Sequence, residues 1–217
     1  MKQKTLLIAS AALLVLAFIG GALFYKAQKS EAAAGAAERN RSHLVRMHSP
    51  NLGKPDAKVH IVEFLDPACE TCRAFYPFVK KLMAANPDRI RLSLRYAAFH
   101  NGSDIVVKML EAARKQGKFW EALEAVLASQ ELWAPNHKPQ PQLVWNFIGG
   151  IGLNLDQVRR DMDAPEIAAV IAQDLADARA LNVTRTPEFF VNGRPMPSFG
   201  YDQLKDLIDT ALAQAYR

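Results

Sequence analysis

The chain has 217 residues and half of them are hydrophobic, so it has enough apolar material for one large domain or two small ones. Its formal net charge of +5 lies in the amino-terminal arm, because residues 1–56 hold eight Lys/Arg and three Asp/Glu whereas residues 57–217 hold nineteen of each. A folded region without net charge argues against nucleic acid as a partner.

The first 25 residues have the composition of a membrane anchor. An uncharged apolar run from Thr5 to Tyr25 follows two lysines and is just long enough, as a helix, to span a bilayer. A cleaved signal peptide has a shorter apolar region with a small-residue cleavage site close behind it, and the Ala-x-Ala options here lie beyond two further lysines. We predict an uncleaved anchor at residues 1–25, and a secreted periplasmic form if the segment is removed.

Residues 26–56 are alanine-rich, polar and basic, and they end in two proline-containing turns. Little in this stretch could bury a core, so it predicts a tether, with a partial helix around residues 31–39. Its basic side chains would favour an anionic membrane surface.

The folded region opens with a strand, a helix and a second strand. Residues 58–65 are β-branched and aromatic, residues 73–86 carry apolar side chains at helical spacing around Pro77, and residues 90–96 alternate between apolar and polar. This order predicts a parallel βαβ unit, with the residues after the first strand at the carboxyl edge of the sheet.

The remainder of the chain is predicted to be a helical insertion followed by a hairpin and a final helix. The pattern gives helices at 104–116, 118–129, 142–148, 155–162 and 165–181, a hairpin at 188–199 turning at Asn192-Gly193, and a helix at 201–215. We therefore expect an α/β fold whose core is formed by residues 57–97 and 183–217, interrupted by an all-helical insertion at residues 98–182.

The only two cysteines, Cys69 and Cys72, directly follow the first strand with C-x-x-C spacing. Such a pair can form a reversible disulfide, half of a metal site, or a structural bridge. A metal site needs further close ligands, and a structural bridge over so short a loop would constrain the unfolded chain little. Redox chemistry is therefore the leading hypothesis, without a metal or a cofactor. The histidines are scattered, at His43, His48, His60, His100 and His137.

The position of each cysteine predicts its role. The thiolate is the attacking species in disulfide exchange, and the amino terminus of a helix stabilises a thiolate through unpaired N–H groups and the helix dipole. Cys69 is placed at such a terminus and Cys72 lies one turn inside it. We predict Cys69 as the nucleophile and Cys72 as the resolving thiol that breaks the mixed disulfide.

Four further residues give the chain a family resemblance. Glu63 lies six residues before Cys69, Pro77 lies eight residues after it, and Thr186-Pro187 precedes the predicted hairpin. With the order of elements, these positions resemble the thioredoxin fold with an inserted helical domain, as in the DsbA-like thiol-disulfide oxidoreductases. The resemblance implies that Glu63 is a buried acid that relays a proton to Cys72, and that Thr186-Pro187 is a cis-proline loop that faces the cysteines and binds the substrate backbone.

The dipeptide between the cysteines departs from the family's strongest oxidants, which have Pro-His there. This chain has Glu70 and Thr71, and a carboxylate beside Cys69 should oppose thiolate formation, although Thr71 offers a hydroxyl. We expect a Cys69 pKa nearer thioredoxin's roughly 7 than the strongest oxidants' roughly 3.5, and a potential less oxidising than about −120 mV.

The expected protein is a thiol-disulfide oxidoreductase that forms or exchanges disulfides in exported proteins. Its catalytic domain would face the periplasm, held to the inner membrane through residues 5–25. Its partners would be reduced client proteins and a membrane redox protein that reoxidises or reduces the Cys69-Cys72 pair. A disulfide isomerase, a reductant for cytochrome or copper-site assembly, and a non-enzymatic metal chaperone remain alternatives.

Overall fold

The computed structural model describes the backbone of residues 2–217 and the side chains of residues 13–21, 24, 25, 28, 31, 35 and 37–217. Its described strands form one mixed sheet in the order β1-β3-β2-β4-β5. The central pair, β2 and β3, is parallel, and the other pairs are antiparallel. The predicted βαβ unit and the hairpin are confirmed. The strands are β1 (Asn51–Leu52), β2 (Val59–Leu65), β3 (Ile90–Tyr96), β4 (Glu188–Val191) and β5 (Arg194–Pro195).

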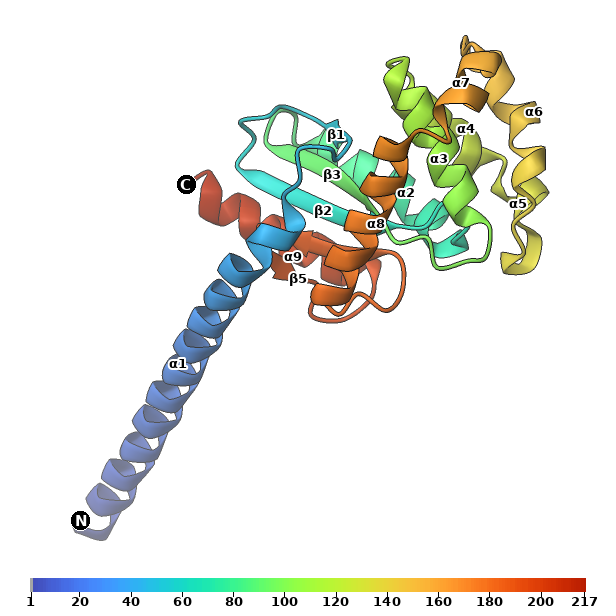
Figure 1. The fold of residues 1–217 in the computed structure, drawn as a ribbon. Coiled ribbons are helices and arrows are strands. Elements are labelled where there is room, and N and C mark those ends of the chain that lie inside the picture. Colours follow the sequence, from blue (N-terminus) through green and yellow to red (C-terminus); the bar gives the residue numbers. More distant parts are fainter. Residues whose placement is uncertain (1) are drawn as a thin grey trace.

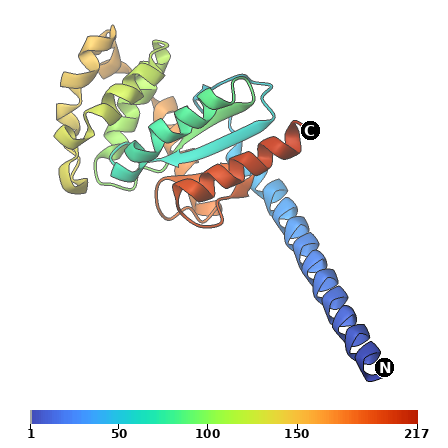
Figure 2. The ribbon, with the colours of Figure 1, turned by 180° about the vertical axis from the view of Figure 1, so that it is seen from behind.

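Helices cover both faces of the sheet because β2 buries side chains on both of its sides. One face packs against α2 (Glu70–Ala85) and α9 (Tyr201–Ala215), which lie across the sheet in Figure 2. The other face packs against α8 (Pro165–Ala180) and the end of α1. Successive strand residues point to opposite faces, so Ile61 joins the first core and Val62 joins the second.

The remaining helices lie beyond the edge of the sheet where β2 and β3 end (Figure 1). They pack around Trp133, which is completely buried and donates its indole N–H to the carbonyl of Val126 at 2.9 Å. The second half of α8 leaves this group and returns to β3, so the predicted insertion is not wholly separate from the sheet. The helices are α3 (Ser103–Lys115), α4 (Phe119–Ala128), α5 (Gln130–Trp133), α6 (Trp145–Ile148) and α7 (Leu155–Asp161).

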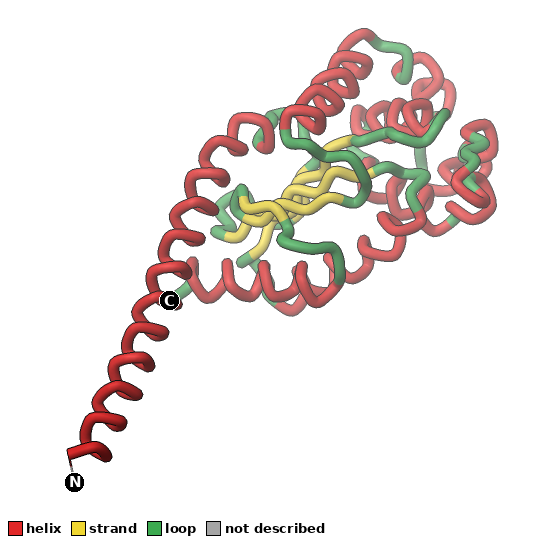
Figure 3. Tube along the Cα trace, turned by 90° about the horizontal axis from the view of Figure 1, so that it is seen from below, coloured by secondary structure: helices red, strands yellow, loops and turns green. Residues whose placement is uncertain are grey.

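The amino-terminal arm is one continuous helix, α1 (Lys2–Leu44), which projects away from the rest of the chain (Figures 1 and 3). The predicted short helix at 31–39 is therefore part of a much longer one. Among the side chains that the structure describes, no helix has an apolar stretch long enough to cross a membrane. The predicted anchor at residues 5–25 falls in part on side chains outside that description.

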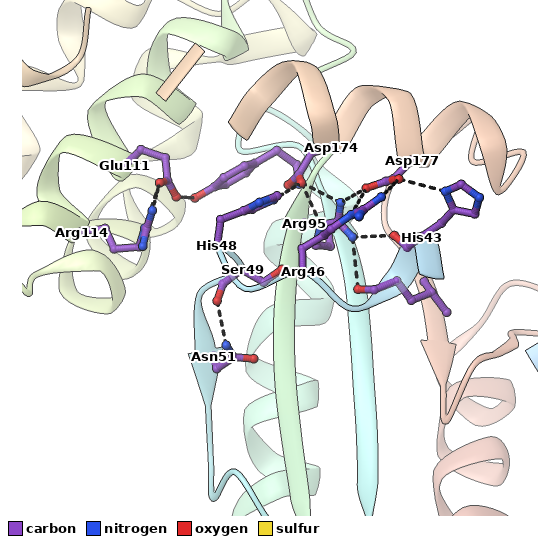
Figure 4. Close-up of polar contacts among 12 residues, drawn as sticks. His43, Arg46, His48, Ser49, Asn51, Arg95, Glu111, Arg114, Asp174 and Asp177 are labelled. Atoms are coloured by element: carbon purple, nitrogen blue, oxygen red, sulfur yellow. Dashed lines mark hydrogen bonds and ion pairs between the residues drawn. The ribbon is translucent and has the colours of Figure 1, made fainter. Parts of the chain in front are cut away.

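The end of the arm does not behave as the free tether that we predicted. Leu44 is 2% exposed and packs against the sheet, and β1 pairs with β3. The fully buried Arg95 of β3 donates to the carbonyls of His43 and Leu44 at 2.7 and 3.1 Å (Figure 4). The sequence pattern could not show this docking, because Arg95 lies more than 50 residues after the two carbonyls that it binds.

Candidate active site

The cysteine motif lies where β2 passes into α2. Cys69 caps the amino terminus of α2 with an extended backbone, at φ −79° and ψ 117°, and the helix begins at Glu70. The helix thus starts three residues earlier than the apolar spacing predicts. This earlier start places the Cys69 sulfur beside the first-turn amides, as the predicted nucleophile requires.

Asp66 fixes the loop that carries the motif, and no pattern in the sequence pointed to it. Its buried carboxylate accepts the backbone N–H groups of Ala68, Phe99 and His100 at 2.8, 2.7 and 2.9 Å. It also contacts Nδ1 of His100 at 2.8 Å. Asp66 therefore ties the loop after β2 to the loop after β3, and it draws His100 to the edge of the site.

The two thiols are unbridged and have opposite environments. Both residues are buried, Cys69 at 5% exposed and Cys72 at 0%, so Cys69 is the one nearer the surface. A hydrogen bond from the Cys72 thiol, helped by Thr186 and by the amides of Thr71 and Cys72, outweighs burial and lowers the pKa of Cys69 to about 5. Burial, together with the hydrogen bond to Cys69, raises the pKa of Cys72 well above its ordinary value.

The pKa of Cys69 lies between the two reference values of the sequence analysis. At about 5 it is below thioredoxin's roughly 7 and above the strongest oxidants' roughly 3.5. The largest contributions come from the Cys72 thiol, from burial and from the Thr186 side chain. The Glu70 side chain is 48% exposed, and its influence on Cys69 stays a prediction.

Glu63 lies in the middle of β2, with Leu94 and Phe189 opposite it on the two neighbouring strands. It is completely buried, and neither carboxyl oxygen has a hydrogen-bond partner among the described residues. Burial, assisted by the nearby Cys69 thiolate, raises the pKa of Glu63 to about 8. The predicted burial is confirmed, and the carboxyl group carries a proton at neutral pH.

The Thr186-Pro187 peptide bond is cis and immediately precedes β4. The Cys69 thiol donates a hydrogen bond to the Thr186 carbonyl at 3.3 Å, across 117 residues of sequence. The predicted contact between this loop and the cysteines is therefore confirmed.

Gln130, at the start of α5, also reaches the motif and was missed. Its fully buried side chain donates from Nε2 to the carbonyls of Pro67 and Cys69 at 2.7 and 3.0 Å. Because it lies 61 residues after Cys69, only the fold brings it to the loop.

A metal site would need further ligands beside the thiols. Among the residues that the structure describes, no group of three or more His, Cys, Asp or Glu side chains has an arrangement that could hold a metal ion. His43 and His48 instead contact Asp177 and Asp174, at 3.0 and 2.6 Å.

Comparison with known proteins agrees with this geometry. The family model Thioredoxin_4, described as thioredoxin, matches residues 46–210. A thioredoxin-like oxidoreductase from Silicibacter pomeroyi DSS-3 superimposes with a TM-score of 0.68 at 34% identity, over 79% of this chain and 96% of that chain. Disulfide bond formation protein D from Bacillus subtilis is 26% identical over 179 residues, 75% of this chain and 77% of that protein.

Other relatives are much longer. A protein named Na(+)/H(+) antiporter NhaA from Herminiimonas arsenicoxydans is 30% identical over 142 residues, which are 65% of this chain and 22% of that protein. The chain therefore spans about a fifth of the length of that relative. The match of the family model covers most of the folded region, including the C-x-x-C loop and the cis-proline loop. The chain belongs to the thioredoxin family, as the family model and the thioredoxin-like oxidoreductase at 34% identity both show.

Proposed function

We propose that this chain catalyses thiol-disulfide exchange on exported proteins, mainly as an oxidant, through the Cys69-Cys72 pair. The contrast between the two thiols carries the proposal. Cys69 keeps a slight exposure of 5% and has a pKa of about 5, whereas Cys72 is completely buried and its pKa is raised. A pair built in this way has one sulfur that a client can attack and one that stays inside.

The oxidation of a client takes two exchange steps. A client thiolate attacks Sγ of Cys69, the Cys69-Cys72 bond breaks, and the electron pair leaves on Cys72, which becomes a thiol by taking a proton. A second client thiolate then attacks the client sulfur of the mixed disulfide, and Cys69 leaves as a thiolate. Two client thiols become a disulfide and the enzyme disulfide becomes two thiols. In the reverse direction Cys72 attacks the mixed disulfide and releases a reduced client.

Each step matches the environment of its leaving sulfur. Cys72 has a raised pKa and leaves poorly as an anion, so the first step needs a proton donor. Glu63, buried and protonated with a pKa of about 8, is that donor in our proposal. Cys69, with a pKa of about 5, leaves readily in the second step.

The low pKa of Cys69 also supports the direction. A stabilised thiolate stabilises the reduced form of the pair, which makes the disulfide a stronger oxidant. This favours an oxidant over a reductant for cytochrome or copper-site assembly. The relative named disulfide bond formation protein D supports the same direction. The Thr186-Pro187 loop, which touches Cys69, would hold the client backbone during the exchange.

We place the reaction outside the cytoplasmic membrane, where disulfides persist, with a membrane redox partner that reoxidises the pair. Attachment through residues 5–25 is also part of the proposal. It is supported by the large apolar side chains in the described part of α1, which are 47 to 79% exposed between Leu13 and Tyr25 and have no cover in the described structure. Membrane fractionation of the full chain in its native host tests the attachment. Release of the protein by carbonate alone would contradict it.

The central experiment traps the mixed disulfide. The probe is a client peptide whose cysteine carries a thiol leaving group as a mixed disulfide. In Cys72→Ser the Cys69 thiolate should attack the peptide sulfur and expel that leaving group, and the adduct should accumulate because no internal thiol can resolve it. Cys69→Ser should form none. Mass spectrometry under non-reducing conditions reads out both variants. An adduct on Cys72 in the Cys69→Ser variant would reverse the assigned roles.

Two further measurements separate the alternatives. Equilibration of the wild-type pair with glutathione gives its potential, and a value close to thioredoxin's roughly −270 mV would favour a reductant. A scrambled-disulfide substrate tests isomerase activity. Stoichiometric metal in the purified protein, together with failure to oxidise or reduce a model disulfide, would favour the metal chaperone.

A further inference from the structure

One segment of the helical insertion, residues 130–137, contacts the cysteine motif at three points. Gln130 holds the carbonyls of Pro67 and Cys69, as described above. The next residue, Glu131, pairs with Arg73 of α2 at 2.7 Å. At the end of the segment, Nε2 of His137 lies 3.9 Å from the Glu70 carboxylate. We name residues 130–137 the clasp, because they reach both the loop before Cys69 and the dipeptide after it.

The backbone and the neighbours of His137 hold its ring in a defined place. Asn136 and His137 are consecutive non-glycine residues with φ of 52° and 57°, a left-handed conformation that such residues seldom adopt. The His137 ring stacks on His100 with centroids 5.3 Å apart and planes 12° apart. His100 is in turn held by the buried Asp66. A chain of contacts thus runs from the base of the motif loop to its exposed dipeptide.

The contact with His137 bears on the charge that Glu70 brings to the motif. A carboxylate in the first turn of a helix interacts favourably with the helix dipole, but it also repels a thiolate that uses the same turn. A cation beside the carboxylate reduces that repulsion. His137 is placed as that cation when its imidazole is protonated, because its Nε2 lies 3.9 Å from the carboxylate.

We propose that His137 is a positioning residue for the redox site: the clasp carries an imidazole to the Glu70 carboxylate, neutralises it, and so preserves the Cys69 thiolate beside an acidic dipeptide. The inference rests on the redox role proposed for Cys69. It means that the helical insertion stabilises the Cys69 thiolate with a histidine. In the family's strongest oxidants that histidine lies in the dipeptide between the cysteines.

Other ionisable groups lie near the His137 and Glu70 contact, and the test must separate their effect on Cys69 from that of His137. Asp66 and His100 lie beneath the His137 ring, and the Glu131 and Arg73 pair lies on the opposite side of the clasp. The His137 and Glu70 side chains are 54 and 48% exposed, so solvent screens their interaction. The expected change in the Cys69 pKa is accordingly modest, roughly half a unit.

The test is a double-variant cycle on the full chain, read by thiolate absorbance during a pH titration of the reduced protein. His137→Ala should raise the Cys69 pKa by roughly half a unit and lower the oxidising equilibrium with glutathione about threefold. In a Glu70→Gln background the same substitution should shift nothing, because no carboxylate remains to be neutralised. His137→Lys should restore the wild-type pKa, whereas His137→Phe, which keeps a stacking ring without charge, should behave like alanine.

Glu131→Gln is the matched control, since it breaks the other exposed ion pair of the clasp without touching Glu70. It should leave the Cys69 pKa unchanged. Equal shifts from His137→Ala in the wild-type and Glu70→Gln backgrounds, or a shift that His137→Phe repairs, would overturn the proposal while the exchange chemistry stands. Wild-type protein that shows no thiol-disulfide exchange with glutathione would instead contradict the proposed function.

Discussion

At the scale of single residues, Glu63 and Cys69 act on stability in opposite directions as the pH changes. The folded-state pKa of Glu63 is raised to about 8, so the folded protein holds a proton that the unfolded chain loses above about pH 4.3. The Glu63 contribution to stability is therefore lost as the pH rises to 8. The folded-state pKa of Cys69 is lowered to about 5, so its contribution grows from pH 5 to about 8.5. In the reduced protein the two effects nearly cancel.

Removal of one of these groups should reveal the pH dependence of stability that the other group contributes. We expect the free energy of unfolding of reduced wild-type protein to change little between pH 7 and 8. Below about pH 6.5 the partly buried His60, whose folded-state pKa is lowered to about 4, adds its own increase of stability with pH. Reduced Glu63→Gln should become more stable from pH 7 to 8, with a slope of up to about 1.4 kcal/mol per pH unit from Cys69 alone. Urea unfolding at several pH values measures the slope. Glu124→Gln, on the surface, is the control, and a Glu63→Gln profile parallel to the wild type would refute the opposed pair.

At the scale of elements, a buried ion cluster joins the arm to β3 and α8. Arg95 contacts Asp174 and Asp177 of α8 at 2.8 and 2.6 Å, and Arg46 of the arm contacts Asp177 at 2.6 Å (Figure 4). Burial opposes the ionisation of Asp177, but the hydrogen bonds from Arg46, His43 and Arg95 hold its pKa below the ordinary range. The cluster has two arginines and two aspartates, so every buried charge has a partner.

Arg95→Met should leave two buried carboxylates without their central cation. We expect it to lower the free energy of unfolding by about 3 to 5 kcal/mol. Lys205→Met is the comparison, because it removes one partner of the half-exposed pair with Asp209 and should cost less than about 1 kcal/mol. Denaturant unfolding of both variants decides the matter. Similar losses would show that the cluster contributes no more than a surface ion pair.

At the scale of the whole molecule, α1 points away from the end of the sheet that carries the cysteines. The described contacts of the arm begin at Ala37, beside the β4-β5 turn, where Gly193 has φ 81° and a Cβ would lie 2.7 Å from the Ala37 carbonyl. The arm therefore first meets the sheet at the β4-β5 turn, beside the start of β2, and its end then reaches Arg95 near the other end of β3. The projecting part of α1 lies away from the end of the sheet where α2 begins (Figure 1).

Two truncations should separate the projecting part of the arm from the docked part. Deletion of residues 1–36 removes none of the described contacts with the sheet and should leave the melting temperature nearly unchanged. Deletion of residues 1–52 also removes Leu44, the arm's share of the ion cluster, and β1. We expect this deletion to lower the free energy of unfolding by roughly 3 kcal/mol or more, and the melting temperature by about 10 °C. Scanning calorimetry compares the two, and equal melting temperatures would show that the docking adds no stability.

Local patterns were sufficient for the order of elements and for the reactive pair. The β-branched run before Cys69, the apolar spacing around Pro77 and the Asn192-Gly193 turn each express a preference of neighbouring residues, so they can be recognised without the fold. The buried state of Glu63 was implied by the family resemblance and is confirmed by the structure. Its proton-relay role, like that of the cis-proline loop, came from family resemblance and remains a proposal.

The residues that set the properties of the site could not be found in this way, because their partners are distant in sequence. Asp66 resembles an ordinary loop carboxylate until β3 brings Phe99 and His100 to it, and Gln130 resembles any other helix residue until α5 reaches the loop before Cys69. The sequence alone determined which two sulfur atoms we propose as the redox pair, since C-x-x-C at a helix start is a local arrangement. Only the tertiary structure decided how acidic Cys69 is, because the thiolate energy depends on burial and on hydrogen bonds from groups that folding assembles.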